Sequence, residues 1–490
     1  MRESVREVLA SRSEPVRICE IGVGEGEILF ELAGHALVRR ACGSDVNAYA
    51  VDRACERVRR LPVELREKID IRHGSYADVF DERFDIVYFN PPYLPQDVSD
   101  RYLSRAQREA LVGGKTGIEV AVDFLARVQH AIVPDSDVLL LMSSLADYAR
   151  LEHEIVLRGL RIRAMRTVRL GFEELYCYHL VPAAPLAYAI RQGVSLTPFA
   201  RGRRSVIFQF GGSDRVVKAS RTSGLLNARK EYGILAELSG LLPVPKVYEV
   251  DDDFFVMERV RGVPASSLDE EGRRAIIAEL VRCAIVLDTL RIKKYEFTRP
   301  YGNVLVDGGR VVLVDFERAS RAKTGNVSQL LEYLRRRGHL SMEQMRMLSD
   351  AYRLRLRAFH ARGDEERDRF VAREHKRILA ALRTSGFYRQ VWDLIARIPP
   401  GKVVTYREIA HKLDSHGYRA VGRACNASPG MPSVPCHRVV NVRGELHGFV
   451  GGIEKKRSLL EEEGVRLVRV EKRDGYDYRV VDLADYLVKL

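Results

Sequence analysis

The feature that most constrains this chain is a set of four blocks near its C-terminal end, around the segment "VPCHRVV". The blocks read "VWDLIARIPPGKVVTYREIA", "RAVGRACNASPG", "VPCHRVV" and "GGIEKKRSLLEEEG", in this order. A buried structural cysteine requires no proline before it and no histidine after it. A nucleophilic cysteine requires a nearby base or positive charge that lowers the pKa of its thiol. We therefore predict Cys436 to be a nucleophile, with His437 as the adjacent base and Glu463 as the carboxylate that orients a histidine–water relay.

These blocks resemble the DNA-binding domain of O6-alkylguanine-DNA alkyltransferases, the methylated-DNA--protein-cysteine methyltransferases, over about 80 residues (387–465). The resemblance implies a small helical domain with a helix-turn-helix, in which "TYREIAHKL" is the first helix and "YRAVGRACNA" is the recognition helix. It also implies binding to double-stranded DNA from the minor groove, with the damaged guanine flipped out of the stack. Cys436 would then take the alkyl group from the guanine oxygen in one irreversible step.

The same resemblance implies three DNA-binding residues. Arg419, which heads the recognition helix, matches the family's intercalating arginine, and Tyr406 matches the tyrosine that supports the extruded nucleotide. Ser428 lies where the family usually has asparagine, eight residues before the cysteine, and serine can still donate and accept hydrogen bonds.

The N-terminal part of the chain, residues 1–185, alternates β-branched runs with helical patterns, which is typical of a parallel α/β sheet. One run ends in "EIGVGEG", which starts at Glu20 and lets the backbone approach a nucleotide cofactor at a helix N-terminus. The three glycines of this loop are Gly22, Gly24 and Gly26. Asp45 ends the next strand, where a carboxylate can hold ribose hydroxyl groups.

The segment "NPPY" follows another strand-like run and offers the groups that hold a planar amide or amino nitrogen. Asn90 can grip that nitrogen through its side-chain amide. Pro91 and Pro92 form a rigid turn, and Tyr93 can pack on the plane of the substrate. Because an sp2 nitrogen is a poor nucleophile, such a grip is useful when it aims the nitrogen lone pair at a methyl sulfonium.

The glycine loop, the carboxylate and the "NPPY" turn together resemble S-adenosyl-L-methionine-dependent N-methyltransferases over about 20–180. The later segment "ALVGGKTGIEVAVDFL" is similar to archaeal and eukaryotic HemK-type glutamine methyltransferases. The resemblance implies S-adenosyl-L-methionine as cofactor and the Gly-Gly-Gln loop of a translation release factor as partner. Methylation of adenine in DNA or RNA is the main alternative, because the same turn serves both substrates.

The middle of the chain carries residues of a kinase-type site. Such a site needs a lysine paired with a helical glutamate on the nucleotide phosphates, and an asparagine and an aspartate on magnesium. Lys218 and Glu231 fit the first pair, and Asn303 and Asp315 fit the second. Their order and spacing resemble RIO-like atypical protein kinases of archaea across roughly 200–340.

The sequence does not assign the catalytic base of this kinase-type site to one residue. The family has an aspartate five residues before the metal-binding asparagine, where this chain has Thr298. Glu296 is the candidate substitute for that base. The resemblance implies ATP with Mg²⁺ as cofactor, and the alternatives are ATP binding alone or a pseudokinase.

Length and composition fit a multidomain cytoplasmic protein. A chain of 490 residues exceeds what one core usually organises, and we predict three domains at 1–185, 190–383 and 384–490. The fold class is multidomain α/β: a Rossmann-like sheet, a two-lobed kinase-like α+β domain and a small helical domain. Seven scattered cysteines favour a reducing compartment, and no apolar run is long enough to span a membrane. The net charge of +13 suits phosphate-bearing partners.

The sequence thus predicts DNA repair by Cys436, fused to an N-methyltransferase and a kinase-like ATP-binding domain. In the alternative, the protein is principally a protein or nucleic-acid N-methyltransferase. Its kinase domain would then be a pseudokinase, and its C-terminal domain would only bind alkylated DNA.

Overall fold

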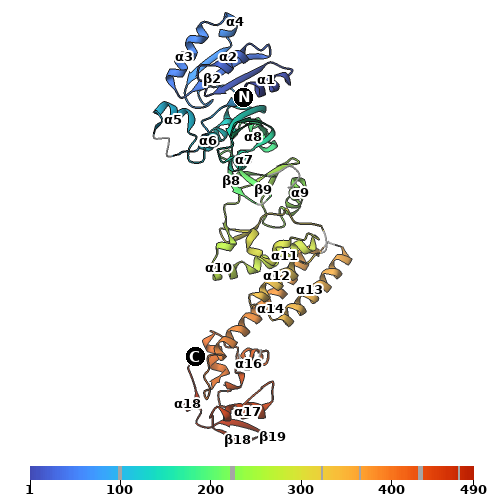
Figure 1. Cartoon of the computed structure of the whole chain (residues 1–490). Helices are drawn as coiled ribbons and strands as arrows, with labels where there is room; N and C mark the ends of the chain where they lie inside the picture. The colour runs from blue at the N-terminus through green and yellow to red at the C-terminus, as the bar shows by residue number, and fades with distance from the viewer. Residues whose placement is uncertain are drawn as a thin grey trace. The chain divides into compact units, whose positions relative to one another are not determined.

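The computed structural model describes residues 1–97, 102–202, 204–220, 227–321, 324–363, 366–428, 434–472 and 475–489. The chain divides into two compact units, Met1–Arg261 and Gly262–Leu490 (Figure 1). The division falls inside the range predicted for the kinase-like domain, so the three predicted domain ranges stay a prediction. None of the helices in the described ranges is long and apolar enough to cross a membrane.

A seven-stranded sheet organises most of the first unit, with strand order β3-β2-β1-β4-β5-β7-β6. Its strands are β1 (Val16–Ile21), β2 (Val38–Asp45), β3 (Ile69–His73), β4 (Phe84–Phe89), β5 (Ile132–Ser143), β6 (Leu160–Leu170) and β7 (Glu173–Pro182). The first five strands are parallel, and β6 and β7 form an antiparallel hairpin at one edge. The predicted Rossmann-like sheet is confirmed, whereas the antiparallel edge is an addition that the sequence pattern did not indicate.

Helices cover both faces of this sheet. They are α1 (Arg2–Ala10), α2 (Glu27–Ala33), α3 (Ala48–Arg59), α4 (Val63–Arg66), α5 (Arg105–Leu111), α6 (Glu119–Arg127), α7 (Tyr148–Leu157) and α8 (Ala184–Arg191). Successive residues of a strand point to opposite faces, and Ile18 and Cys19 accordingly belong to two different hydrophobic cores. The chain order reverses between β1 and β4. In an open sheet of this kind, the carboxyl ends of the strands at the reversal form the expected ligand crevice.

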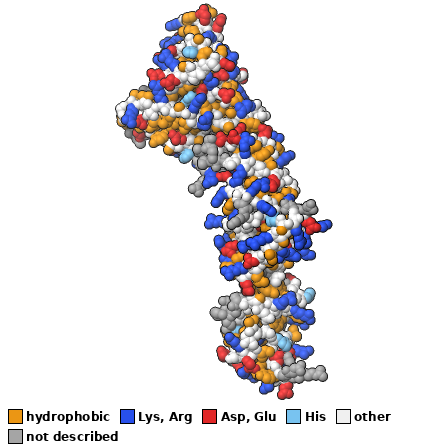
Figure 2. Space-filling model, turned by 90° about the vertical axis from the view of Figure 1, so that its right-hand side faces the viewer, with side chains coloured by type: hydrophobic (Ala, Val, Ile, Leu, Met, Phe, Trp, Pro, Cys, Tyr) orange, Lys and Arg blue, Asp and Glu red, His pale blue; other side chains and the backbone are white. Residues whose placement is uncertain are grey.

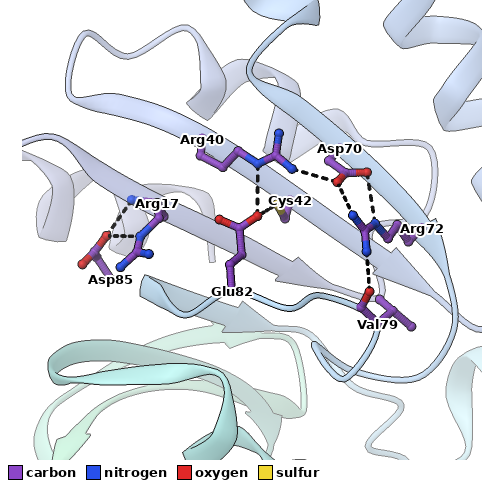
Figure 3. A network of polar contacts seen from close by, with 8 residues as sticks. All are labelled: Arg17, Arg40, Cys42, Asp70, Arg72, Val79, Glu82 and Asp85. Atoms are coloured by element: carbon purple, nitrogen blue, oxygen red, sulfur yellow. Dashed lines mark hydrogen bonds and ion pairs between the residues drawn. The ribbon is translucent and has the colours of Figure 1, made fainter. Parts of the chain in front are cut away.

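Ion pairs hold the connection between β3 and β4 against the sheet (Figure 3). Arg40 on β2 contacts Glu82 at 3.1 Å, and the Arg72 guanidinium donates to the Val79 carbonyl at 2.7 Å. Exposed ion pairs of this kind add little stability singly, but together they fix the path of the connection. The path matters because the first residues of the connection, Gly74 to Tyr76, line a cavity at the carboxyl ends of the strands.

A second sheet of the first unit has five antiparallel strands in the order β11-β12-β10-β9-β8. The strands are β8 (Leu196–Arg201), β9 (Ser205–Phe210), β10 (Arg215–Ser220), β11 (Val247–Val250) and β12 (Phe254–Glu258). Helix α9 (Ala228–Leu238) packs beside it and starts at Asn227, whose side chain accepts from the Lys230 N–H at 2.9 Å. An asparagine cap satisfies one of the free N–H groups of a helix start.

The second unit begins with a mainly helical part. It contains β13 (Val263–Pro264), α10 (Glu270–Ala275), α11 (Ile277–Thr289), β14 (Val304–Asp307), β15 (Arg310–Leu313), α12 (Asn326–Arg336), α13 (Met342–Arg362) and α14 (Arg367–Ile395). The fully buried Asp288 of α11 accepts the N–H groups of Gly325 and Asn326, both at 2.9 Å, and so fixes the start of α12. Burial raises the pKa of Asp288, although these hydrogen bonds oppose the shift.

The C-terminal part of this unit follows α14 without a break. Its elements are β16 (Val404–Thr405), α15 (Tyr406–Lys412), α16 (Tyr418–Asn426), β17 (Val439–Val440), α17 (Ile453–Glu462), β18 (Leu467–Lys472), β19 (Gly475–Val480) and α18 (Leu483–Tyr486). Helices α15 and α16 coincide with the predicted helix-turn-helix segments. The Thr405 hydroxyl accepts from the Glu408 N–H at 3.1 Å and caps α15, while the predicted tail forms the β18–β19 hairpin.

Candidate active sites

Cys436 lies in the hydrophobic core of the C-terminal part, at the start of a single 3₁₀ turn that ends at Arg438. Its side chain is 6% exposed. The Cys436 thiol donates to the Ser428 hydroxyl at 3.2 Å, so the structure brings these two predicted site residues together. When the thiol is ionised, the same serine hydroxyl can donate to the sulfur and stabilise the thiolate.

His437, Arg438 and Glu463 form a buried polar group behind the cysteine. The Nε2 atom of the fully buried His437 lies 2.9 Å from Glu463 Oε1. The Arg438 guanidinium donates to both oxygens of the same carboxylate at 2.6 to 3.1 Å. Burial opposes ionisation of Glu463, but the hydrogen bonds from Arg438 and His437 outweigh it and lower the pKa of Glu463 to about 2.

The hydrogen bond to Glu463 fixes the tautomer of His437. A carboxylate only accepts, so Nε2 carries the hydrogen and Nδ1 presents its lone pair. Within the described residues, this Nδ1 atom is buried and has no hydrogen-bond partner. Burial lowers the pKa of His437, and the hydrogen bond to Glu463 offsets only part of that shift. Among the described residues, the neutral imidazole therefore keeps an unoccupied acceptor at Nδ1, which is the atom that a histidine–water relay requires.

Two residues that sequence reasoning missed make the thiol acidic. Cys425 on α16 lies in the same core as Cys436; its interaction with Cys436, the Ser428 hydroxyl and the charge of Lys456 together outweigh burial and lower the pKa of Cys436. Lys456 is fully buried, and its Nζ donates to the carbonyls of Val439 at 2.6 Å and His447 at 3.1 Å. Burial lowers the pKa of Lys456 to about 8.

These residues carried only a weak signal in the sequence. Lys456 and Leu460 are four residues apart on α17 and both are buried, which places them on one face. Cys425 shares the buried face of α16 with Val421. Helical spacing could have placed both residues in the core, but lysine is usually exposed and therefore does not point to a buried site.

A cavity of about 610 Å³ lies beside this core. Its lining includes Tyr406, Tyr418 and Asn426 from α15 and α16, and His447 from the segment after β17. The Tyr406 hydroxyl donates to the His447 carbonyl at 3.3 Å, and burial raises the pKa of Tyr406. Arg419 is exposed at the second residue of α16 and does not line the cavity.

The acidity of Cys436 predicts how its reactivity depends on pH. Since the thiolate is the nucleophile, the transfer rate should rise about tenfold per pH unit below the pKa and level off above it. The midpoint is expected below the ordinary pKa of a cysteine thiol, because the pKa of Cys436 is lowered. In Cys425→Ala, which lacks one hydrogen-bond donor to the thiolate, the midpoint should move to higher pH. Single-turnover rates across pH test both statements, and an unchanged midpoint in the variant would contradict this role of Cys425.

The first unit has its own cavity, of about 710 Å³, at the carboxyl ends of β1, β2 and β4. The predicted residues that line it are Gly22, Gly24, Asp45, Asn90 and Pro92. The predicted residues that do not line it are Glu20, Gly26, Pro91 and Tyr93. The cavity lies at the strand-order reversal, where a doubly wound sheet is expected to bind its ligand.

The glycine loop of this cavity needs glycine for steric reasons. Gly26 has φ +81°, and a Cβ there would lie 2.3 Å from the Phe30 ring. The Gly24 N–H donates to Asp45 Oδ2 at 2.9 Å, which ties the loop to the end of β2. Glu20 lies below the loop and accepts from the Tyr88 hydroxyl at 3.2 Å; burial raises its pKa to about 8 despite this hydrogen bond.

Asn90 directly follows β4, and its side chain is exposed toward the same cavity. The glycine-rich segment that resembles the one in HemK-type enzymes supports the "NPPY" turn, which begins at Asn90. A Cβ on Gly113 would lie 2.4 Å from the Pro92 carbonyl oxygen, and one on Gly117 would lie 2.4 Å from that of Tyr93. The glycines are therefore required for close backbone contact with the "NPPY" turn, which gives this sequence segment a structural role.

The kinase-type residues lie in both units. In the first unit, the Lys218 ammonium lies 2.8 and 2.9 Å from the two oxygens of Glu231, and both side chains are buried. In the second unit, Asn303 ends a 3₁₀ turn and Asp315 follows β15 with φ +61°. The candidate base Glu296 lies 3.6 Å from the Lys294 ammonium.

The second unit thus contains two consecutive helices in helix-turn-helix order and a buried cysteine in the same core. Residues 386–465 match the family model described as 6-O-methylguanine DNA methyltransferase, DNA binding domain. Residues 194–336 match the RIO domain. The alkyltransferase and RIO parts of the predicted fusion are therefore confirmed, and they follow a Rossmann-like sheet whose role as a methyltransferase stays a prediction.

Several methylated-DNA--protein-cysteine methyltransferases are similar to the C-terminal domain. The Salmonella typhimurium protein is 43% identical over 83 residues, which are 17% of this chain and 48% of that protein. The Mycobacterium tuberculosis protein is 44% identical over 86 residues, 17% of this chain and 52% of that protein. The Saccharolobus islandicus protein is 43% identical over 86 residues, which are 18% of this chain and 56% of that protein. The chain spans about half the length of the curated relatives that it matches.

Two solved structures are also similar in part. S. pombe Atl1, in complex with damaged DNA containing O6-carboxymethylguanine, is 35% identical and has a TM-score of 0.19, over 21% of this chain and 96% of that chain. A methyltransferase from Pyrococcus furiosus is 17% identical and has a TM-score of 0.27, and the match covers 37% of this chain and 83% of that chain. TM-scores at this level do not establish a shared fold.

Proposed function

We propose that the C-terminal domain repairs O6-alkylguanine in double-stranded DNA by moving the alkyl group irreversibly onto Cys436. The observation that carries this proposal is the buried Cys436 thiol in contact with Ser428, followed directly in the chain by the His437 that pairs with Glu463. A cavity lies beside this core and can receive an extruded base. The relatives that match this domain are named for the same reaction.

The reaction requires one bond to form and one to break. The sulfur of Cys436 attacks the alkyl carbon, so that an S–C bond forms while the C–O6 bond breaks. The electron pair of the broken bond stays on the guanine, which takes up one proton. The thiol proton passes through a water to Nδ1 of His437, whose Nε2–H remains on Glu463. Because the thioether is stable, each chain acts once.

A titration tests this stoichiometry. The protein is mixed in rising ratio with a duplex that carries a labelled O6-methylguanine, and label on protein and DNA is counted after completion. We expect one methyl group per chain and unmodified guanine in the DNA. Continued turnover beyond that ratio, or label that stays on the DNA, would contradict the proposal.

We also propose that the first unit is an S-adenosyl-L-methionine-dependent N-methyltransferase. The residues of its cavity fit this cofactor. Gly22 has φ +66° and leaves room for a close ligand, and Asp45 ends β2 beside the Gly24 N–H. When bound, the cofactor supplies an electrophilic methyl group on sulfonium. Asn90 would hold the acceptor nitrogen through its side-chain amide, and the Pro91–Pro92 turn would keep that amide in place.

The acceptor that we propose is a side-chain amide, specifically the glutamine of a translation release factor. The support is the segment at Gly113–Gly117, which resembles that of HemK-type enzymes and packs on the "NPPY" turn. Adenine in DNA or RNA is the second candidate. Methylation assays with a protein domain that carries a Gly-Gly-Gln loop and with adenine-containing oligonucleotides, run side by side, separate the two candidate acceptors.

We further propose that the RIO domain binds ATP with Mg²⁺. The buried pair of Lys218 and Glu231 supports this, since such a pair positions nucleotide phosphates. Asn303 and Asp315 stay the predicted metal residues, and Glu296 stays the predicted base in place of the missing aspartate. Binding of a fluorescent ATP analogue with and without magnesium tests the proposal: Lys218→Met should weaken binding at least about tenfold. Binding without any phosphate transfer would identify a pseudokinase.

A further inference from the structure

Helix α14 (Arg367–Ile395) follows the range that matches the RIO domain and continues into the range that matches the DNA-binding domain model. Near its start, His375 Nε2 lies 2.8 Å from the Ala278 carbonyl oxygen of α11. Near its end, Trp392 Nε1 donates to the Ala424 carbonyl of the recognition helix α16 at 2.7 Å. The helix has no break between these contacts, so its outer face runs directly toward the DNA-binding helices.

One face of α14 carries only alanine and basic residues. Spacings of three and four residues place them on one side of a helix. The members of this basic stripe are Arg369, Ala372, Arg373, Lys376, Ala380 and Arg383, and all are exposed. The same spacing continues to Phe387 and Leu394, which pack in the core around Cys436. The stripe therefore leads along the helix into the repair domain.

The cations of the basic stripe are available for a ligand. Lys376 and Arg383 have no carboxylate partner within the described part of the chain. Arg369 and Arg373 share Glu366, at 3.0 and 3.5 Å, and exposed pairs of this kind are weak. The alanines between the cations have short side chains, so they leave the charged groups accessible to a ligand. Figure 2 shows Lys and Arg side chains gathered at the height at which Figure 1 labels α13 and α14.

We propose that the basic stripe binds the phosphate backbone of double-stranded DNA beside the lesion held by the Cys436 domain. This inference rests on the proposed repair function. From Arg369 to Arg383 the helix rises about 21 Å, which equals the length of about six base pairs. Cations at this spacing, of which Lys376 and Arg383 have no carboxylate partner in the described part of the chain, match the phosphates of a polyanion of this length. The stripe would thus add affinity that is independent of sequence.

The test compares the full-length protein with the triple variant R373Q/K376Q/R383Q. Binding is measured over a range of salt concentrations on two duplexes with a central O6-methylguanine, one with roughly 15 base pairs on each side and one with roughly 4. The matched control is R59Q/R60Q/R66Q, which removes the same charge from exposed positions of the first unit. Thermal unfolding checks that the variants are folded.

On the long duplex, we expect the triple variant to bind at least about tenfold more weakly and its salt slope to fall by about 2 to 3. On the short duplex, its affinity and methyl-transfer rate should equal those of the unchanged protein. An unchanged slope on the long duplex, an equal loss on both duplexes, or an equal loss in the control would overturn the inference. Methyl transfer on the short duplex reports separately on the proposed repair, so the two can fail independently.

Discussion

Replacing Cys436 with serine is expected to abolish alkyl transfer while the affinity for alkylated duplex stays within about twofold, because phosphate contacts dominate that affinity. A serine hydroxyl in the same place has a far higher pKa than the thiol and would stay protonated. The hydrogen bond with Cys425 and the charge of Lys456 stabilise a thiolate and cannot ionise an alcohol at neutral pH. Transfer of label from an O6-methylguanine duplex, measured together with binding, tests this.

The control for this variant is Cys55→Ser. Cys55 lies on α3 of the first unit and is partly exposed, so its loss should leave transfer unchanged. All seven cysteines are free thiols, and any of them could react slowly with a strong alkylating agent. Residual transfer in the Cys436 variant would therefore identify a second acceptor and contradict the assignment of Cys436 as the nucleophile.

Replacing Asn90 with alanine is expected to reduce methylation by the first unit at least about 100-fold, because the acceptor nitrogen would lose its orientation. Affinity for S-adenosyl-L-methionine should stay within about twofold, since Asn90 lies at the end of β4 and the loop that holds the cofactor lies after β1. The Asp45→Ala variant should behave in the opposite way and lose cofactor affinity, because Asp45 offers the carboxylate for the ribose.

Calorimetric cofactor binding and methylation of a Gly-Gly-Gln loop domain, measured on both variants, separate these two effects. Loss of cofactor binding in Asn90→Ala would show that this residue acts on the cofactor rather than on the acceptor. Full methylation in the same variant would remove the "NPPY" turn from the proposed chemistry.

The sequence was most informative where a function needs an unusual residue order. His437 and Glu463 are 26 residues apart, yet the motif order was enough to predict a relay, and the structure places their side chains 2.9 Å apart. Lys218 and Glu231 were likewise predicted as a pair and lie in direct contact. Such pairs can be predicted because the chemistry requires both residues and the motif order places each of them.

The sequence was least informative about burial and helix continuity. Lys456 is fully buried, but nothing in its own residue type indicates this. The boundary predicted at 383/384 falls inside α14, which continues through Gly386. A serine–glycine pair usually favours a break, and here the packing of both ends of the helix overrides that preference. Tertiary packing of this kind leaves no local pattern.

Helix α14 physically links two parts of the second unit. Helix α14 packs near one end against α11, which lies in the range that matches the RIO domain, and near the other end against α16, which lies in the range that matches the DNA-binding domain model. A change in the position of α14 would therefore reach the recognition helix.

The measurement that tests the central claim most directly is the intact mass of the full chain after incubation with a duplex that carries one O6-methylguanine. We predict a gain of one methyl group per chain, mapped by peptide mass to Cys436, and loss of the lesion from the DNA. An unchanged protein mass, with the duplex bound and the lesion intact, would contradict repair and would leave a domain that only binds alkylated DNA.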